Sequence, residues 1–100
     1  MANEEYIYQR GETVPIHADV QDWDDAYVDP TSIVIDVWDV SGTKKVTAQA
    51  MSKLETGKYV YYYTSLAADE EGWWRSMATI TDGSGAGAKV TMRPGSFKLQ

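Results

Sequence analysis

Apolar and polar residues alternate along most of the chain, and turn-forming residues interrupt this alternation roughly every ten positions. Between residues 14 and 20, for example, every second residue is apolar, which is typical of a strand with one buried face. Helical periodicity is sustained nowhere. Short strands separated by regular turns indicate an all-β, immunoglobulin-like antiparallel sandwich of about seven strands. We expect these strands within residues 5–9, 14–20, 33–37, 45–51, 58–64, 74–80 and 90–99.

Three segments break the alternation. Residues 22–30 are polar and end in Asp-Pro, which predicts a loop. Residues 67–72 tolerate helix locally but are long enough for only a single helical turn. Pro94 and Gly95 interrupt the last strand, so we expect a bulge or an edge position there.

The chain has 100 residues, of which 43% are hydrophobic and 24% charged, as in ordinary folded domains. This length allows one hydrophobic core but not two. We therefore expect a single domain over residues 1–100, with residues 1–4 as a flexible N-terminal arm. The seven Tyr and four Trp favour pleated, half-buried surfaces over helices.

The net charge is −6, and no stretch of sequence gathers Lys and Arg on one face, so we expect neither nucleic acid nor membrane as a partner. The N-terminus has neither the basic start nor the apolar run of a signal peptide, which predicts a protein made in the cytoplasm. The absence of Cys excludes disulfides and thiolate metal sites and fits a reducing compartment.

Five short motifs follow one another in a fixed order along the chain. They occupy residues 8–14, 28–30, 37–43, 56–59 and 72–74. This order resembles macroglobulin-type and bacterial immunoglobulin-like modules. It is most similar to small immunoglobulin-like proteins encoded among the structural genes of tailed phages and prophages.

The resemblance implies two core residues and no catalytic ones. In such modules the Tyr after Thr-Gly and the Trp after Gly pack in the core, which here are Tyr59 and Trp74. Strand parity agrees, because it places Trp74 inward and its neighbour Trp73 outward. The motifs are turn and core signatures, which define a fold better than a function.

Catalysis requires a nucleophile, an acid–base pair or a metal. His17 is the single histidine, and it falls on the polar face of its strand. With no Cys and no second His, neither a nucleophile dyad nor a His-rich metal site can form. We therefore expect no enzyme activity and no catalytic residues.

One loop gathers acidic residues. Asp22, Asp24, Asp25 and Asp29 could surround Ca²⁺, which takes six to eight oxygen ligands. The loop lacks the regular spacing of an EF-hand. The alternative is a solvated acidic loop, in which case the protein uses no cofactor.

Aromatic residues provide the remaining signal. Trp23 and Tyr27 lie in a predicted loop, whereas Trp38, Tyr62 and Trp73 fall on outward positions of strands. Large exposed aromatics are typical of interfaces. Some of them are expected instead to cover sandwich edges or to pack beneath loops.

Three functions are compatible with these features. The first is a virion structural protein, for capsid decoration or head or tail assembly, which self-associates or docks on a larger viral assembly. The N-terminal segment of residues 1–9 would contribute to that contact, because a short first strand can pair with a neighbour's edge. The second is a carbohydrate-binding or cell-surface adhesion module that uses exposed aromatics and calcium. The third is an interaction module excised from a larger protein.

Overall fold

The computed structural model describes residues 7–22, 24–83 and 88–100, and these residues form strands and turns without a helix. Accordingly, this part of the chain contains no helix that could cross a membrane. The predicted all-β class is confirmed, with eight strands where the sequence indicates about seven. The strands are β1 (Ile7–Tyr8), β2 (Thr13–Asp19), β3 (Ser32–Trp38), β4 (Lys44–Ala50), β5 (Ser52–Glu55), β6 (Lys58–Thr64), β7 (Gly72–Asp82) and β8 (Lys89–Leu99).

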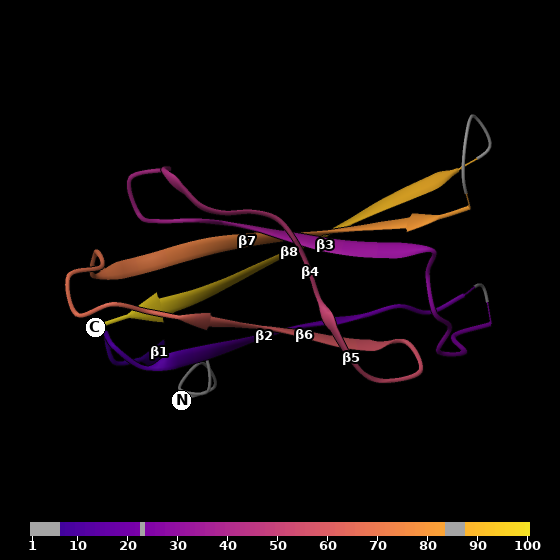
Figure 1. The fold of residues 1–100 in the computed structure, drawn as a ribbon, viewed down its shortest axis with the longest axis horizontal. Coiled ribbons are helices and arrows are strands. Elements are labelled where there is room, and N and C mark those ends of the chain that lie inside the picture. Colours follow the sequence, from indigo (N-terminus) through magenta and orange to yellow (C-terminus); the bar gives the residue numbers. More distant parts are fainter. Residues whose placement is uncertain (1–6, 23, 84–87) are drawn as a thin grey trace.

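The strands form two sheets that pack face to face (Figure 1). The larger sheet has five strands in the order β1-β8-β7-β3-β4, and the smaller has three in the order β2-β6-β5. All pairs are antiparallel except β1 and β8, which run parallel for two residues. This arrangement is an immunoglobulin-like sandwich, in which each sheet buries one face.

The eighth strand arises where the chain passes from one sheet to the other. β4 pairs with β3 in the larger sheet, and β5 pairs with β6 in the smaller one. Met51 lies between them, buried in the core, and its backbone N–H donates to the Ile33 carbonyl at 3.2 Å. Figure 1 shows this connection crossing between the two layers. A strand that changes sheets closes a corner of the sandwich.

Aromatic side chains fill one end of the core. The ring of Trp74 lies 5.5 Å from that of Tyr63 and 5.8 Å from that of Phe97, measured between centroids. Such tilted and offset contacts are favourable beyond the area they bury. Trp74 is fully buried, Tyr59 is also buried and Trp73 is exposed, which is the register that the alternation predicts.

The structure decides two local predictions, one for residues 67–71 and one for Pro94. Residues 67–71 form turns rather than a helical turn, and the buried Asp69 carboxylate organises them by accepting the Leu66 N–H at 2.8 Å. Pro94 lies in a continuous register opposite Met77, so no bulge occurs there. Between Lys89 and Phe97 no described strand pairs with the other side of β8, which places Pro94 on an edge.

Candidate functional site

Charge is distributed unevenly between the sheets. The four long strands of the five-stranded sheet carry six basic side chains and only two acidic ones, although the whole chain has a net charge of −6. The basic residues are Lys44, Lys45, Arg75, Lys89, Arg93 and Lys98. The sequence analysis finds no such cluster, because these residues are far apart in the chain and meet only through strand pairing.

The outer face of the five-stranded sheet combines these cations with apolar side chains. Because Trp38 pairs with Arg75 and Trp73 with Lys98, all four share the face that points away from the core. Trp73 is 46% exposed and Met92 is 59% exposed. We define the outer face by Val34, Trp38, Trp73, Arg75, Met77, Val90, Met92 and Lys98.

Two cations hold the indole of Trp38. The Lys44 Nζ atom lies 5.3 Å from the Trp38 ring centroid, and the Arg75 guanidinium carbon lies 5.9 Å from it. Both distances fall in the range of cation–π attraction. Lys44 also lies 3.5 Å from the Asp36 carboxylate. Trp38 is therefore half-buried in its own sheet, and the more accessible indole on this face is that of Trp73.

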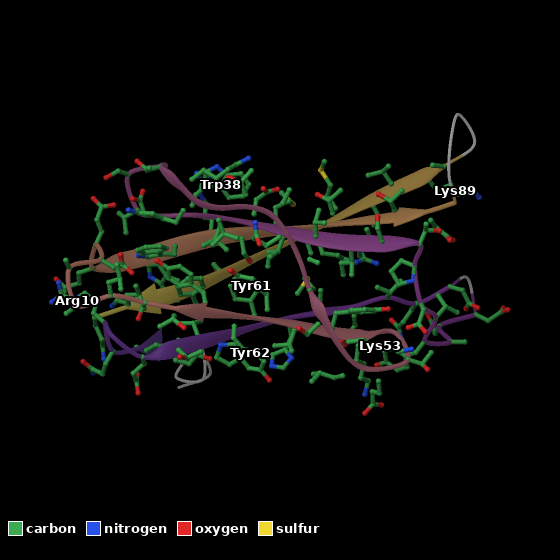
Figure 2. The ribbon with its side chains drawn as sticks, viewed as in Figure 1. Arg10, Trp38, Lys53, Tyr61, Tyr62 and Lys89 are labelled. Atoms are coloured by element: carbon green, nitrogen blue, oxygen red, sulfur yellow. The ribbon has the colours of Figure 1, made fainter. Side chains whose placement is uncertain are left out.

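The structure does not bring the three predicted interface aromatics together. Trp38 and Trp73 share the outer face of the larger sheet, whereas Tyr62 is 56% exposed on the outer side of the smaller sheet. Figure 2 shows Trp38 and Tyr62 on opposite sides of the sandwich, with Tyr61 between the layers. A single contact surface can include the two tryptophans or the tyrosine, but not all three.

The acidic loop uses its carboxylates to hold its own backbone. The Asp22 carboxylate accepts the N–H groups of Asp24 at 2.9 Å and Ala26 at 3.1 Å. Within the described residues, all four candidate aspartates included, no group of three acidic or histidine side chains could hold a metal ion. The geometry therefore supports the solvated acidic loop and gives no support to calcium.

Asp29 fastens this loop to the smaller sheet. Its carboxylate accepts hydrogen bonds from Lys53 Nζ at 2.6 Å, the Tyr59 hydroxyl at 2.9 Å and the Gly57 N–H at 3.0 Å. The Lys53 hydrogen bond makes the largest contribution to lowering the pKa of Asp29 from 3.8 to about 2, followed by those from Gly57 and Tyr59. The role of Asp29 is structural.

The other predicted candidates offer no catalytic arrangement. His17 is exposed on β2. Tyr27 lies in its loop with the Lys58 ammonium 4.8 Å from its ring centroid, and Trp23 falls outside the described residues. The His17 side chain makes no hydrogen bond or ion pair with another described residue.

Comparison with known proteins supports the fold. No protein-family model matches the chain, and no curated protein matches its sequence. Among solved structures, the filamin domain of Lin-41 superposes with a TM-score of 0.64 at 15% identity, covering 97% of this chain and 85% of that one. A DUF4785 family protein from Legionella pneumophila has a TM-score of 0.69 at 12% identity, covering 96% of this chain. This chain spans only 26% of the length of that protein.

These similarities define the class of protein. At such low identity they establish a shared fold, that of an immunoglobulin-like domain, and they carry no residue-level function. The chain is thus an immunoglobulin-like domain.

Proposed function

We propose that this domain binds a partner protein through the outer face of its five-stranded sheet. The observation that carries the proposal is the exposure of Trp73 and Met92 beside Arg75 and Lys98, on the basic sheet of an acidic protein. Aromatic residues, Met and Arg are enriched at protein interfaces, and the cations complement an acidic partner surface. The expected partner therefore presents an apolar patch bordered by carboxylates.

The sheet edges favour a contact through the face over pairing between strands. At the two ends of the β2–β6 ladder, the Ser65 N–H donates to the Glu12 carbonyl, and the Val20 N–H donates to the Gly57 carbonyl. The even-numbered residues of β2 therefore direct their backbone hydrogen bonds to β6. Pro15 is odd-numbered, so its backbone nitrogen faces the open edge of β2. Proline has no N–H, and this edge therefore lacks a hydrogen-bond donor at that position.

The same reasoning applies to β8. Gln100 bonds to Tyr8 and Arg10 on the β1 side of this segment, and Pro94 has the same parity. Pro94 therefore also faces an open edge. Proline at an edge hinders the addition of further strands, so the β2 and β8 edges are protected against pairing with another chain, whereas β4 and β5 form the other edges of the two sheets.

The finer expectation, a virion component for capsid decoration or head or tail assembly, is part of this proposal. The motif order, which resembles phage-encoded immunoglobulin-like proteins, supports it. A protein that docks on a preformed assembly needs an exposed contact face and must stay unassembled until the partner appears. Protected edges and a net charge of −6 suit this requirement.

Sedimentation velocity of the purified protein tests the proposal, alone and mixed with the products of the neighbouring genes. We expect a faster-sedimenting complex with one of these products, and the complex should weaken as the salt concentration rises. Retention on a polysaccharide column that Trp73→Ala abolishes, with no protein complex, would overturn the proposal in favour of carbohydrate binding.

A further inference from the structure

A groove of about 610 Å³ opens on the side of the sandwich where β2 and β8 face each other. Ile35, Ala78 and Phe97 contribute apolar side chains from the inner face of the larger sheet. Pro15 and Pro94 belong to the two strands that border it. A groove of this size with a mixed polar and apolar lining is typical of ligand sites, and it meets the outer face at Trp73, which also lines it.

One polar residue that lines the groove has no hydrogen-bond partner in the protein. Ser76 is only 5% exposed, and its hydroxyl makes no hydrogen bond to any described residue. Gly95 lies directly opposite on β8, where a Cβ atom would come within 2.7 Å of the Ser76 Oγ atom. Gly95 therefore keeps the space beside this hydroxyl open. No described side-chain oxygen is sealed from solvent without a partner, so this hydroxyl is reached from the groove and can donate to a ligand atom there.

A cation lies beside this hydroxyl. Arg93 pairs with Ala78, two residues from Ser76 on the same strand face, and it also lines the groove. Arg93 has no ion-pair or hydrogen-bond partner among the described residues. None of the described residues that line the groove is acidic. An arginine fork and a hydroxyl donor together match a carboxylate, which accepts several hydrogen bonds.

We propose that the groove binds an extended acidic segment of a partner protein. A Glu or Asp carboxylate of that segment bonds to Arg93 and Ser76. An apolar side chain two residues away, which shares the same face of an extended chain, packs on Pro15 and Ile16, which are partly exposed and line the groove. The proposal rests on the proposed function only in taking the partner to be a protein, and its surface shares Trp73 alone with the outer face.

The test is a titration of the full-length, 15N-labelled protein with the peptide acetyl-Thr-Glu-Thr-Phe-Thr-amide, followed by NMR. We expect saturable shifts at the amides of Ser76, Arg93 and Gly95. The same peptide with Gln in place of Glu should bind at least tenfold more weakly, because it loses the charge-assisted bonds. Equal affinity for the two peptides, no binding, or shifts confined to the outer face would overturn the proposal.

Matched variants assign the contacts. Arg93→Ala and Ser76→Ala should each weaken peptide binding at least fivefold, and Gly95→Ala should do so by filling the space beside the hydroxyl. Ser76→Ala should not lower the melting temperature, since it removes a hydroxyl that makes no hydrogen bond within the described residues. The control Arg75→Ala removes a cation from the opposite face of the same sheet and should leave affinity unchanged. If Arg75→Ala weakens binding as much as Arg93→Ala, the groove is not the site. In either case the outer face remains testable with the variant Arg75→Glu and the neighbouring gene products, because Arg75 does not line the groove.

Discussion

Trp73 and Trp74 are adjacent on β7, and their side chains lie on opposite faces of the sheet. Trp74 fills the core against Tyr63 and Phe97, and its indole N–H donates to the Glu70 carbonyl at 2.9 Å. Trp73 points to the opposite face and is 46% exposed. Sequence parity can predict this difference, because alternation along a strand is a local property.

Replacing Trp74 with Ala should lower the free energy of unfolding by about 3–5 kcal/mol, as large aromatic truncations in cores do. Trp73→Ala should change it by less than about 1 kcal/mol, because exposed substitutions cost little. Urea denaturation of both variants measures the two values. Comparable losses in the two variants would contradict the register of β7.

Asp29 gives the molecule a predicted dependence of stability on pH. Its pKa is lowered from 3.8 to about 2, so the stability it contributes is present above pH 3.8 and is lost as the pH falls toward 2. Asp29→Asn should be less stable than the wild type at pH 7, and the difference should shrink between pH 4 and pH 2. Thermal melts across this range measure it. A difference that stays constant with pH would show that the charge is not what holds the loop.

At the scale of elements, strands with alternating apolar residues could be predicted, whereas β5 could not. β3 and β7 bury every second residue along part of their length, and the inward positions of β2 and β6 are buried or half-buried, so the positions of these strands follow from the sequence. All four residues of β5 are exposed, so it carries no hydrophobic signal. For the acidic loop, the sequence could not decide between calcium and a solvated loop, because spacing alone does not reveal that Asp22 and Asp29 bond to backbone N–H groups.

The two edge prolines provide a prediction at this scale. A double variant, Pro15→Thr and Pro94→Thr, restores an N–H donor at each open edge without disturbing the ladders to β6 and β7. We expect this variant to self-associate at concentrations where the wild type stays monomeric, as measured by sedimentation velocity. Matched substitutions at two exposed positions outside the edges, Tyr62→Thr and Leu66→Thr, serve as the control. Identical sedimentation of the double variant and the wild type would show that the prolines do not protect the edges.

At the scale of the whole molecule, the basic sheet of an acidic protein could not be predicted from the sequence. Lys44, Arg75 and Lys98 are separated by more than twenty residues each, and the pairing of β4, β3, β7 and β8 brings them into one sheet. Pairing order is a long-range property, and local alternation does not determine it. The sequence could nominate Trp38, Tyr62 and Trp73, but it could not decide which of them share a surface.

The affinity of the domain for the partner found by sedimentation, compared between face variants, tests the central claim most directly. Trp73→Ala and Arg75→Glu should each weaken the complex at least tenfold, because a central aromatic and a cation facing an acidic surface carry much of the binding energy. Tyr62→Ala, on the opposite sheet, should leave the dissociation constant within about twofold of the wild type, as expected for a residue outside the contact. If Tyr62→Ala weakens the complex while both outer-face variants bind like the wild type, the outer face of the five-stranded sheet is not the binding surface.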